Sequence, residues 1–203
     1  MTLKEQIIKE ILKPNFKENG FKISGNHYRK VENGFIKVFN PQFSMFNDSE
    51  NVRLTFNMGL YFPETTKFEN RIEPKKLSCH DCQFEERYGH LCTDSGNDYW
   101  IEKNDSNTVE EFENEIKDSV EKSIKWFNQF DSIESLKSLR NHKYAWNAYR
   151  INYDIALFAL KEDTVKALDI IKNEIANLEG SESNWTIRLK ESYEKIKTVY
   201  NKM

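Results

Sequence analysis

The chain has 203 residues and a mass of 24.2 kDa, which exceeds one typical domain of roughly 100–150 residues but falls short of two full domains. Hydrophobic residues make up 38% of the chain and aromatic residues 13%, enough for a sizeable core, so wholesale disorder is excluded. The 30 Lys and Arg residues nearly balance the 33 Asp and Glu residues, and the net charge of −3 supplies no general attraction to nucleic acid.

Targeting signals and cysteine usage predict the compartment. The chain contains no run of ~18–20 apolar residues that could span a membrane, and its first ten residues lack the apolar region of a secretory signal. Three cysteines are an odd number, which argues against a disulfide framework. We therefore expect a cytoplasmic protein with no membrane partner.

The first predicted element is a helix from Leu3 to about Leu12. It begins with a capping-box pattern at Thr2-x-x-Glu5 and should end at Pro14. Two short strands are expected over residues 20–23 and 26–31, and the sequence Glu32-Asn33-Gly34 is typical of a hairpin turn.

The sheet should continue over residues 35–46, with Pro41 at a bulge or edge position because proline donates no ladder hydrogen bond. Residues 52–60 alternate apolar and smaller or polar side chains, which predicts a strand with one face buried under helices. A short strand is expected around Tyr99-Trp100-Ile101. Residues 62–78 give no clear pattern.

A second capping box, Thr108-x-x-Glu111, should begin a long helix whose apolar residues recur every three or four positions as far as Phe127. Beyond Asp131 the pattern is helical over 132–140, 142–161, 163–179 and 183–201, with Gly180 placed to end a helix.

The predicted fold class is α+β. An antiparallel sheet with N-terminal and central helices should form a domain over residues 1–130. Residues 131–203 should form an all-helical, hairpin-like extension packed on that domain.

The cysteines suggest a metal site. Cys79 and Cys82 are spaced as Cys-x-x-Cys, and His90 and Cys92 follow, so three thiolates and one imidazole could hold a zinc ion. The alternative is that the cysteines are small apolar residues or free thiols. A redox pair or a cysteine nucleophile is less supported, because no parallel βαβ unit and no orienting group are recognisable. We expect no cofactor, with zinc as the alternative.

Five side chains are candidates for ligand binding, because polar groups on a rigid sheet beside an aromatic ring are typical of a binding cleft. The alternative is structural: amides facing solvent, surface ion pairs and a core tryptophan. No glycine-rich phosphate loop, HExxH motif or Gly-x-Ser-x-Gly elbow is present. The candidates are Arg29, Gln42, Asn57, Arg87 and Trp100.

Residues of about 3–130 resemble the uncharacterised bacterial domain-of-unknown-function family 4304. The resemblance implies an antiparallel α+β domain and supplies no activity, cofactor or substrate. Of the cysteine-rich stretch it includes only Cys82. It rests on short motifs in a fixed order: Gly20-Phe21-Lys22, Gly25, Tyr28-Arg29, Gln42, Phe56-Asn57-Met58-Gly59, Cys82, Arg87-Tyr88-Gly89 and Tyr99-Trp100.

The leading functional hypothesis is a non-catalytic protein-interaction or immunity-type module whose partner is another protein and not nucleic acid. One alternative is a small-ligand-binding protein or hydrolase with a pocket on the sheet. A second alternative is a zinc-stabilised structural domain. The sequence does not predict the oligomeric state.

Overall fold

The fold was analysed in a computed structural model, which describes residues 1–48, 51–66, 72, 74–93, 98–136, 138–139, 156, 164–178, 180 and 182–200. The chain divides into two compact units. The first consists of Met1–Tyr61 and Leu77–Ser135, and the second of Phe62–Lys76 and Leu136–Met203. Within the described part of the chain, no helix combines the length and the apolar character needed to cross a membrane.

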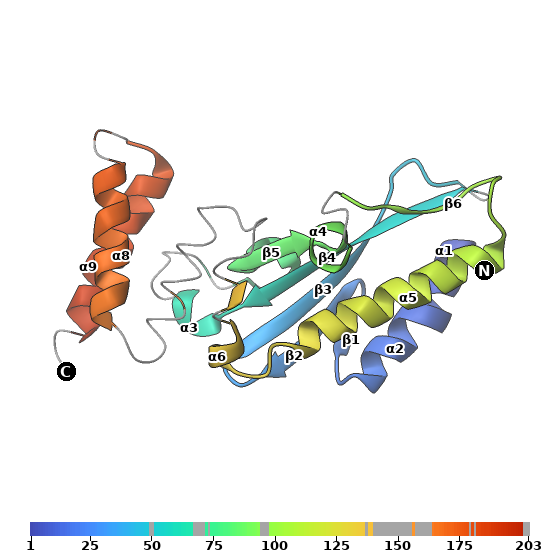
Figure 1. The fold of residues 1–203 in the computed structure, drawn as a ribbon, viewed down its shortest axis with the longest axis horizontal. Helices are drawn as coiled ribbons and strands as arrows, with labels where there is room; N and C mark the ends of the chain where they lie inside the picture. Colours follow the sequence, from blue (N-terminus) through green and yellow to red (C-terminus); the bar gives the residue numbers. More distant parts are fainter. Residues whose placement is uncertain are drawn as a thin grey trace. The chain divides into compact units, whose positions relative to one another are not determined.

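The first unit is built on an antiparallel sheet (Figure 1), and the predicted α+β class is confirmed. Its strands are β1 (Lys22–Ser24), β2 (His27–Glu32), β3 (Phe35–Phe43), β4 (Val52–Tyr61), β5 (Phe84–Arg87) and β6 (Ile101–Lys103). The order is β1-β2-β3-β4-β5, and β6 also pairs with β4. Because β5 pairs with residues 57–60 of β4 and β6 with residues 52–54, the two short strands lie along different stretches of the same β4 edge.

The hairpin turn between β2 and β3 is confirmed. Glu32 pairs with Phe35, so the turn has two central residues, Asn33 (φ 45°) and Gly34 (φ 94°). Positive φ at both positions matches the right-handed twist of the flanking strands. The Asn33 side chain also donates a hydrogen bond to the Asp131 carbonyl.

The structure also explains how Pro41 fits within a strand. The pairing of β2 with β3 ends at Tyr28 and Phe39, whereas β3 continues beside β4 and pairs Pro41 with Phe56. Pro41 therefore lies on a local edge of the sheet, as expected, where its missing N–H removes no ladder hydrogen bond.

The N-terminal helix continues past Pro14, so the predicted end of this helix is wrong. The helical run consists of α1 (Leu3–Gln6), the π-helical segment η1 (Ile7–Leu12) and α2 (Lys13–Glu18). At its junction with α2 the Lys13 N–H donates to the Ile8 carbonyl, five residues back. A π turn shifts the hydrogen-bonding pattern just before the proline, and this relieves the clash that proline causes in a regular helix.

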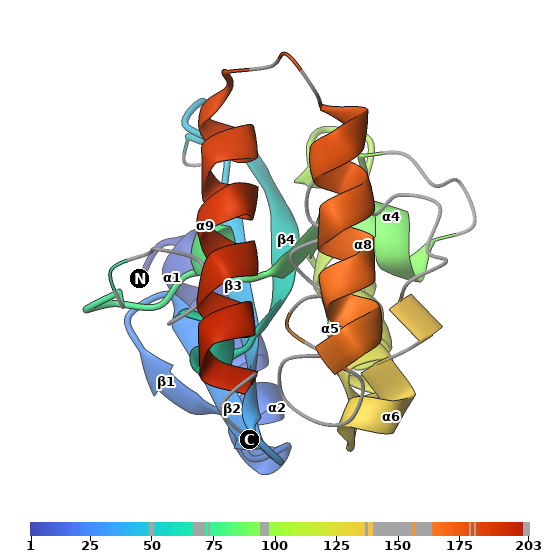
Figure 2. The ribbon, with the colours of Figure 1, turned by 90° about the vertical axis from the view of Figure 1, so that its left-hand side faces the viewer.

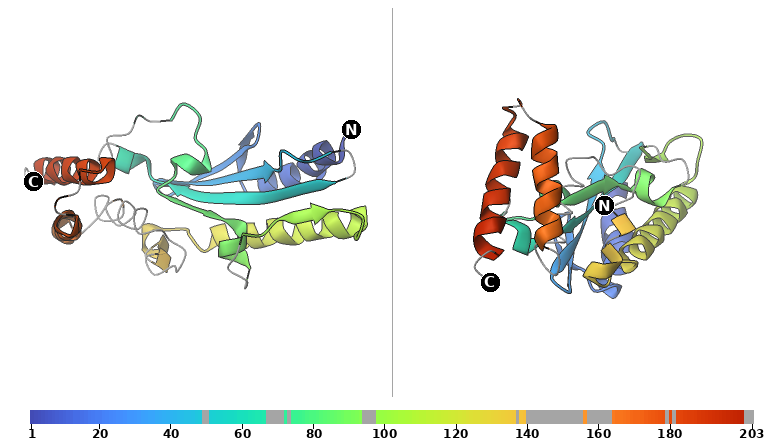
Figure 3. Two further views of the ribbon diagram at one scale, coloured as in Figure 1. Left: turned by 90° about the horizontal axis from the view of Figure 1, so that it is seen from above. Right: turned by 60° about the vertical axis from the view of Figure 1, so that its left-hand side comes forward.

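One face of the sheet is covered by α2 and by α5 (Val109–Asn128), which runs along the sheet in Figures 1 and 3. Phe16 of α2 lies at the centre of an aromatic cluster and packs against Phe21, Tyr28 and Phe39 at ring-centroid distances of 5.0, 5.1 and 4.1 Å. Phe21 in turn contacts Phe127 of α5. Both predicted capping boxes, at Thr2 and Thr108, are present and satisfy orphan N–H groups at the helix starts.

The predicted burial of one β4 face under helices is confirmed, and the opposite face is largely buried as well. Thr55, Asn57 and Gly59 are buried, although they point away from α5. The segment Leu77–Cys82, which contains the 3-10 turn η2 (Cys79–Asp81), covers part of this second face. The Cys79 thiol donates to the carbonyl of Asn57 at 3.2 Å, and a Cβ on Gly59 would lie only 2.6 Å from the Cys82 sulfur.

The second unit contains the short helix α3 (Pro63–Thr66) and the helices α8 (Thr164–Asn177) and α9 (Asn184–Tyr200), which lie side by side (Figure 2). α6 (Ile133–Leu136) joins the units in sequence. The predicted helices over 163–179 and 183–201 are confirmed, and Gly180 has a φ of 85°. The predicted helix over 142–161 lies outside the described residues except for the buried Ala156. The core of the α8–α9 pair consists of Ile171, Leu189 and Ile196.

Candidate functional site

Polar side chains gather on the sheet face opposite α5, beyond the part that Leu77–Cys82 covers. In an antiparallel pair, residues in register point to the same face. Asn57 is in register with Arg87, Arg53 with Glu102, and Gln42 with Thr55. We define the polar strip as Gln42, Arg53, Asn57, Arg87, Asp98, Trp100 and Glu102.

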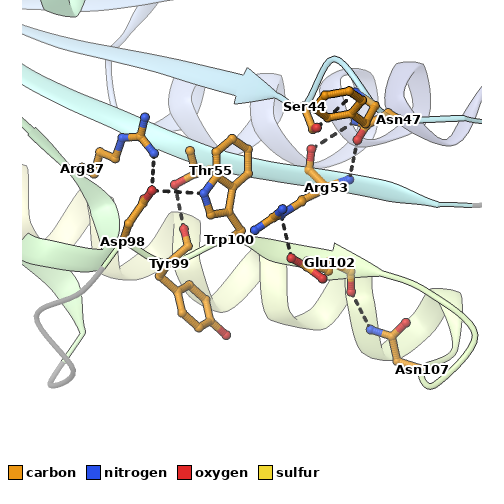
Figure 4. Close-up of polar contacts among 11 residues, drawn as sticks. Ser44, Asn47, Arg53, Thr55, Arg87, Asp98, Tyr99, Trp100, Glu102 and Asn107 are labelled. Atoms are coloured by element: carbon orange, nitrogen blue, oxygen red, sulfur yellow. Dashed lines mark hydrogen bonds and ion pairs between the residues drawn. The ribbon is translucent and has the colours of Figure 1, made fainter.

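Trp100, directly before β6, is the aromatic centre of the polar strip (Figure 4). The guanidinium carbon of Arg53 lies 4.8 Å from its ring centroid, and that of Arg87 lies 5.6 Å away. The indole Nε1 donates to Asp98 Oδ2 at 3.2 Å. Both guanidiniums are within the range of a cation–π interaction, so the indole is held by contacts on several sides.

Each arginine of the polar strip also has an acidic partner. Arg87 Nη1 lies 2.5 Å from Asp98 Oδ2, and Arg53 Nε lies 2.6 Å from Glu102 Oε1. Burial would raise the pKa of Asp98, but the hydrogen bonds from Arg87 and Trp100 outweigh it and lower the pKa below its usual value. All four charged side chains are 34–51% exposed, so the pairs add at most about 1 kcal/mol each to stability. Their main effect is to fix where the guanidiniums point.

Two amides extend the polar strip toward β3. Asn57 Nδ2 donates to Gln42 Oε1 at 3.0 Å, and the Asn57 residue is only 7% exposed. Thr55, on the same face, donates from its hydroxyl to the Tyr99 carbonyl at 2.8 Å, which ties the segment before β6 to β4. The sheet backbone and these hydrogen bonds make the polar strip a preorganised surface.

Four of the five side chains predicted to bind a ligand lie in the polar strip, and Arg29 does not. Arg29 Nη2 donates to the Leu77 carbonyl at 2.7 Å, while its buried Nε has no hydrogen-bond partner among the described residues. Arg29 is in register with Val38 and Gly59, under the covering segment. Its observed contact therefore holds Leu77–Cys82 against the sheet.

Three members of the polar strip were not predicted from the sequence. Arg53 and Glu102 become neighbours only when β6 pairs with β4, a pairing that the sequence does not specify. Asp98 has a local signal, since a residue two positions before Trp100 in an extended chain points to the same side. That spacing could have identified it.

The sheet separates the four residues considered for zinc. Cys79 and Cys82 belong to the covering segment, and the Cys79 sulfur contacts the carbonyls of Val38 and Asn57. His90 and Cys92 belong to α4 (Tyr88–Cys92), on the side of α5, where the Cys92 sulfur contacts the Lys122 carbonyl at 3.8 Å. Within the described ranges no group of three or more His, Cys, Asp or Glu side chains could hold a metal ion. The structure therefore does not bring the four together.

Burial also raises the pKa values of two of the cysteine thiols. It raises the pKa of Cys79 well above its ordinary value, and it raises the pKa of Cys92 to about 12. A thiol with a raised pKa is neutral at physiological pH and is a poor nucleophile. In their observed positions both thiols act as small, neutral packing groups.

The region that contains the polar strip matches the profile of a known protein family. The profile of a family described as a domain of unknown function (DUF4304) matches residues 12–129. The chain belongs to the DUF4304 family. The match runs from the end of η1 through all six strands to the end of α5, so the whole polar strip belongs to the DUF4304 region. Neither a curated protein nor a solved structure matches the chain.

Proposed function

We propose that this DUF4304 protein is a non-catalytic protein-interaction module that binds a partner protein through the polar strip. The observation that carries the proposal is the position of Trp100 between the guanidiniums of Arg53 and Arg87 on a rigid sheet. Tryptophan and arginine are the residue types most enriched among the side chains that dominate binding energy at protein interfaces.

Preorganisation supports this proposal. Fixing long side chains at an interface costs about 0.5–1.5 kcal/mol for each side chain. In the polar strip, Glu102 and Asp98 already hold the two arginines before any partner arrives. The two arginines are therefore already ordered, and binding a partner costs little further side-chain conformational entropy.

The loop between β3 and β4 extends the surface with apolar side chains. Met45 and Phe46 are 88% and 87% exposed. The loop is anchored beside the polar strip, because the Asn47 side chain accepts from the Arg53 N–H at 2.9 Å and donates to the Arg53 carbonyl at 3.1 Å. Two adjacent, exposed apolar residues on an anchored loop fit the pocket of a partner protein.

The chemistry of the polar strip favours binding over hydrolysis. The Thr55 hydroxyl on the same face is engaged with the Tyr99 carbonyl, and both carboxylates of the polar strip are engaged by arginines. These features support a protein surface more than the alternative of a ligand pocket or hydrolase site on the sheet.

Quantitative affinity enrichment from cells that express the protein tests the proposal. Wild type would be compared with Trp100→Ala and with Lys125→Ala, which changes an exposed residue of α5. A protein that wild type and Lys125→Ala enrich equally, and Trp100→Ala does not, would then be purified for direct titration. We expect Trp100→Ala to weaken that binding about 30-fold or more, the effect of losing a dominant interface residue.

Two results would contradict the proposal. The first is a directly binding partner whose affinity is the same for wild type and Trp100→Ala. The second is turnover of a hydrolase or nuclease substrate that disappears in Arg87→Ala while the variant remains folded. The second result would favour the enzyme alternative.

A further inference from the structure

A second candidate site lies on the helix-covered side of the sheet, away from the polar strip. It is a cavity of about 510 Å³ between α4, α5 and the residue before Trp100. Tyr88 of α4 and Tyr99 supply aromatic side chains to its wall, and α5 supplies Glu115, Asp118 and Lys122. This volume lies within the usual range for small-molecule pockets, about 300–1,000 Å³.

The two tyrosines give the cavity an aromatic wall. Their rings are 6.2 Å apart, and Tyr88 packs against Phe56 of the core, which fixes its position. The Tyr99 hydroxyl donates to Glu115 Oε1, and this bond, with burial as a smaller cause, raises the pKa of Tyr99 to about 12. The bond places the Glu115 carboxyl group directly beside the Tyr99 phenol at the cavity wall.

The charges around the cavity do not cancel. Lys122 Nζ lies 2.7 Å from Asp118 Oδ2, so these two residues neutralise each other. Glu115 forms no ion pair with a Lys, Arg or His side chain of the described part of the chain. One carboxylate thus remains uncompensated next to two aromatic rings.

We propose that this cavity binds an organic cation that carries an ammonium or guanidinium group. A carboxylate accepts charge-assisted hydrogen bonds from such a group, and aromatic rings attract a cation through their faces. The neutral Cys92 thiol and the tyrosine rings supply the apolar part of the wall. The inference is independent of the proposed function, because no residue of the polar strip contributes to the cavity.

The cation could come from a free small molecule or from an arginine or lysine side chain of another protein. The shared chemistry is the cationic group itself, and the probes can separate the two sources. Agmatine represents a free cation. Nα-acetyl-arginine amide and Nα-acetyl-lysine amide represent side chains within a protein, because their backbone termini are blocked. Nα-acetyl-citrulline amide has nearly the shape of the arginine probe without its charge.

The test is a titration of the full chain with each probe, followed by backbone amide NMR shifts of residues in α4, α5 and the segment around Tyr99. We expect saturable shifts with at least one cationic probe and much weaker shifts with the citrulline probe. Tighter binding of agmatine would indicate a free ligand, and tighter binding of a blocked probe would indicate a protein side chain. Equal binding of the citrulline probe would overturn the proposal, as would the absence of saturable shifts with every cation.

Glu115→Gln provides the decisive variant, and Glu110→Gln is its matched control on an exposed position of the same helix. We expect Glu115→Gln to weaken cation binding about tenfold or more, the effect of losing a charge-assisted hydrogen bond, and Glu110→Gln to leave it unchanged. Thermal unfolding would establish that both variants are folded. Unchanged affinity in folded Glu115→Gln would overturn the proposal.

Discussion

Lys37 Nζ lies 2.5 Å from Glu32 Oε2, and only 1% of the Lys37 side chain is exposed. Burial lowers the pKa of Lys37, and the ion pair with Glu32 opposes that shift. Glu32 is 23% exposed and has a second partner, Lys30, at 3.3 Å. The two sides of this ion pair are therefore unequal, because only the lysine is fully buried, whereas the carboxylate is partly exposed and has a second cationic partner.

The first prediction concerns this asymmetry. Glu32→Gln should lower the free energy of unfolding by about 3–5 kcal/mol, because it removes the carboxylate that is hydrogen-bonded to a buried cation. Lys37→Met should be near neutral or stabilising, since an apolar chain of similar length replaces the buried charge. Urea unfolding at pH 7 measures both variants.

Lys30→Met is the matched control for Glu32→Gln, because Lys30 pairs with the same carboxylate from a 26% exposed position. It should cost no more than about 1 kcal/mol. If Glu32→Gln cost no more than this control, the buried ion pair would not have the stabilising role inferred here.

The second prediction concerns the contact between β4 and the covering segment. In Gly59→Ala the added Cβ would lie 2.6 Å from Cys82 Sγ and 2.9 Å from Cys82 Cβ. Both atoms must move, and overpacking of this kind costs about 1–3 kcal/mol. The loss should appear as a lower urea midpoint with an unchanged slope.

Cys82→Ala supplies the test of mechanism for this prediction. Removing the sulfur relieves the closest contact, so the double variant should be less unstable than the sum of the single effects. Additive losses would show that the steric contact with the Cys82 sulfur is not the cause.

The third prediction concerns Tyr28. Its hydroxyl is buried without a hydrogen-bond partner in the described structure, and burial raises its pKa to about 12. Tyr28→Phe removes an unsatisfied polar group and should stabilise the protein at pH 7, by about 1 kcal/mol. Chemical unfolding at several pH values measures the change.

The pH dependence of this variant follows from the direction of the pKa shift. The hydroxyl loses its proton at about pH 10 in the unfolded chain but only near 12 in the folded protein. Below about pH 10 the hydroxyl is neutral in both states and adds no pH dependence, whereas ionisation in the unfolded chain lowers the stability of the folded protein as the pH rises toward 12. Tyr28→Phe should therefore lose less stability than wild type between pH 10 and 11.5. An identical loss in both proteins would assign the alkaline sensitivity to other groups.

Local signals in the sequence predicted the parts of the fold that depend on neighbouring residues. The Asn33-Gly34 turn and the capping boxes at Thr2 and Thr108 involve residues no more than three positions apart, and all three are present. The helix end at Pro14 was wrong because a π turn in the preceding residues accommodates the proline. The helix preferences of individual residues do not predict a π turn.

Contacts between distant segments account for what the sequence did not predict. The alternating pattern of β4 indicated the face that is buried under helices but gave no sign of the second cover, because Leu77–Cys82 packs on the other face from sixteen or more positions farther along the chain. Arg29 was predicted to bind a ligand for the same reason, because its hydrogen-bond partner, the Leu77 carbonyl, belongs to a distant segment of the chain. Polar side chains are unusual in apolar strands, which identified Gln42, Asn57 and Arg87, and Trp100 was added as the aromatic residue beside them. The pairing of Arg53 with Glu102 could not be predicted in this way, because it needs the register of β6.

Tyr99 and Trp100 are consecutive residues of one extended segment, and their side chains point to opposite sides of the sheet (Figure 4). The phenol reaches Glu115 of α5, while the indole lies between the two arginines. A one-residue insertion or deletion between Asp98 and Ile101 would exchange the two side chains, because successive residues of a strand alternate in direction. The number of residues between Asp98 and Ile101 therefore determines which side chain enters the polar strip and which faces the cavity beside α5. An insertion or deletion in this stretch would change both surfaces together.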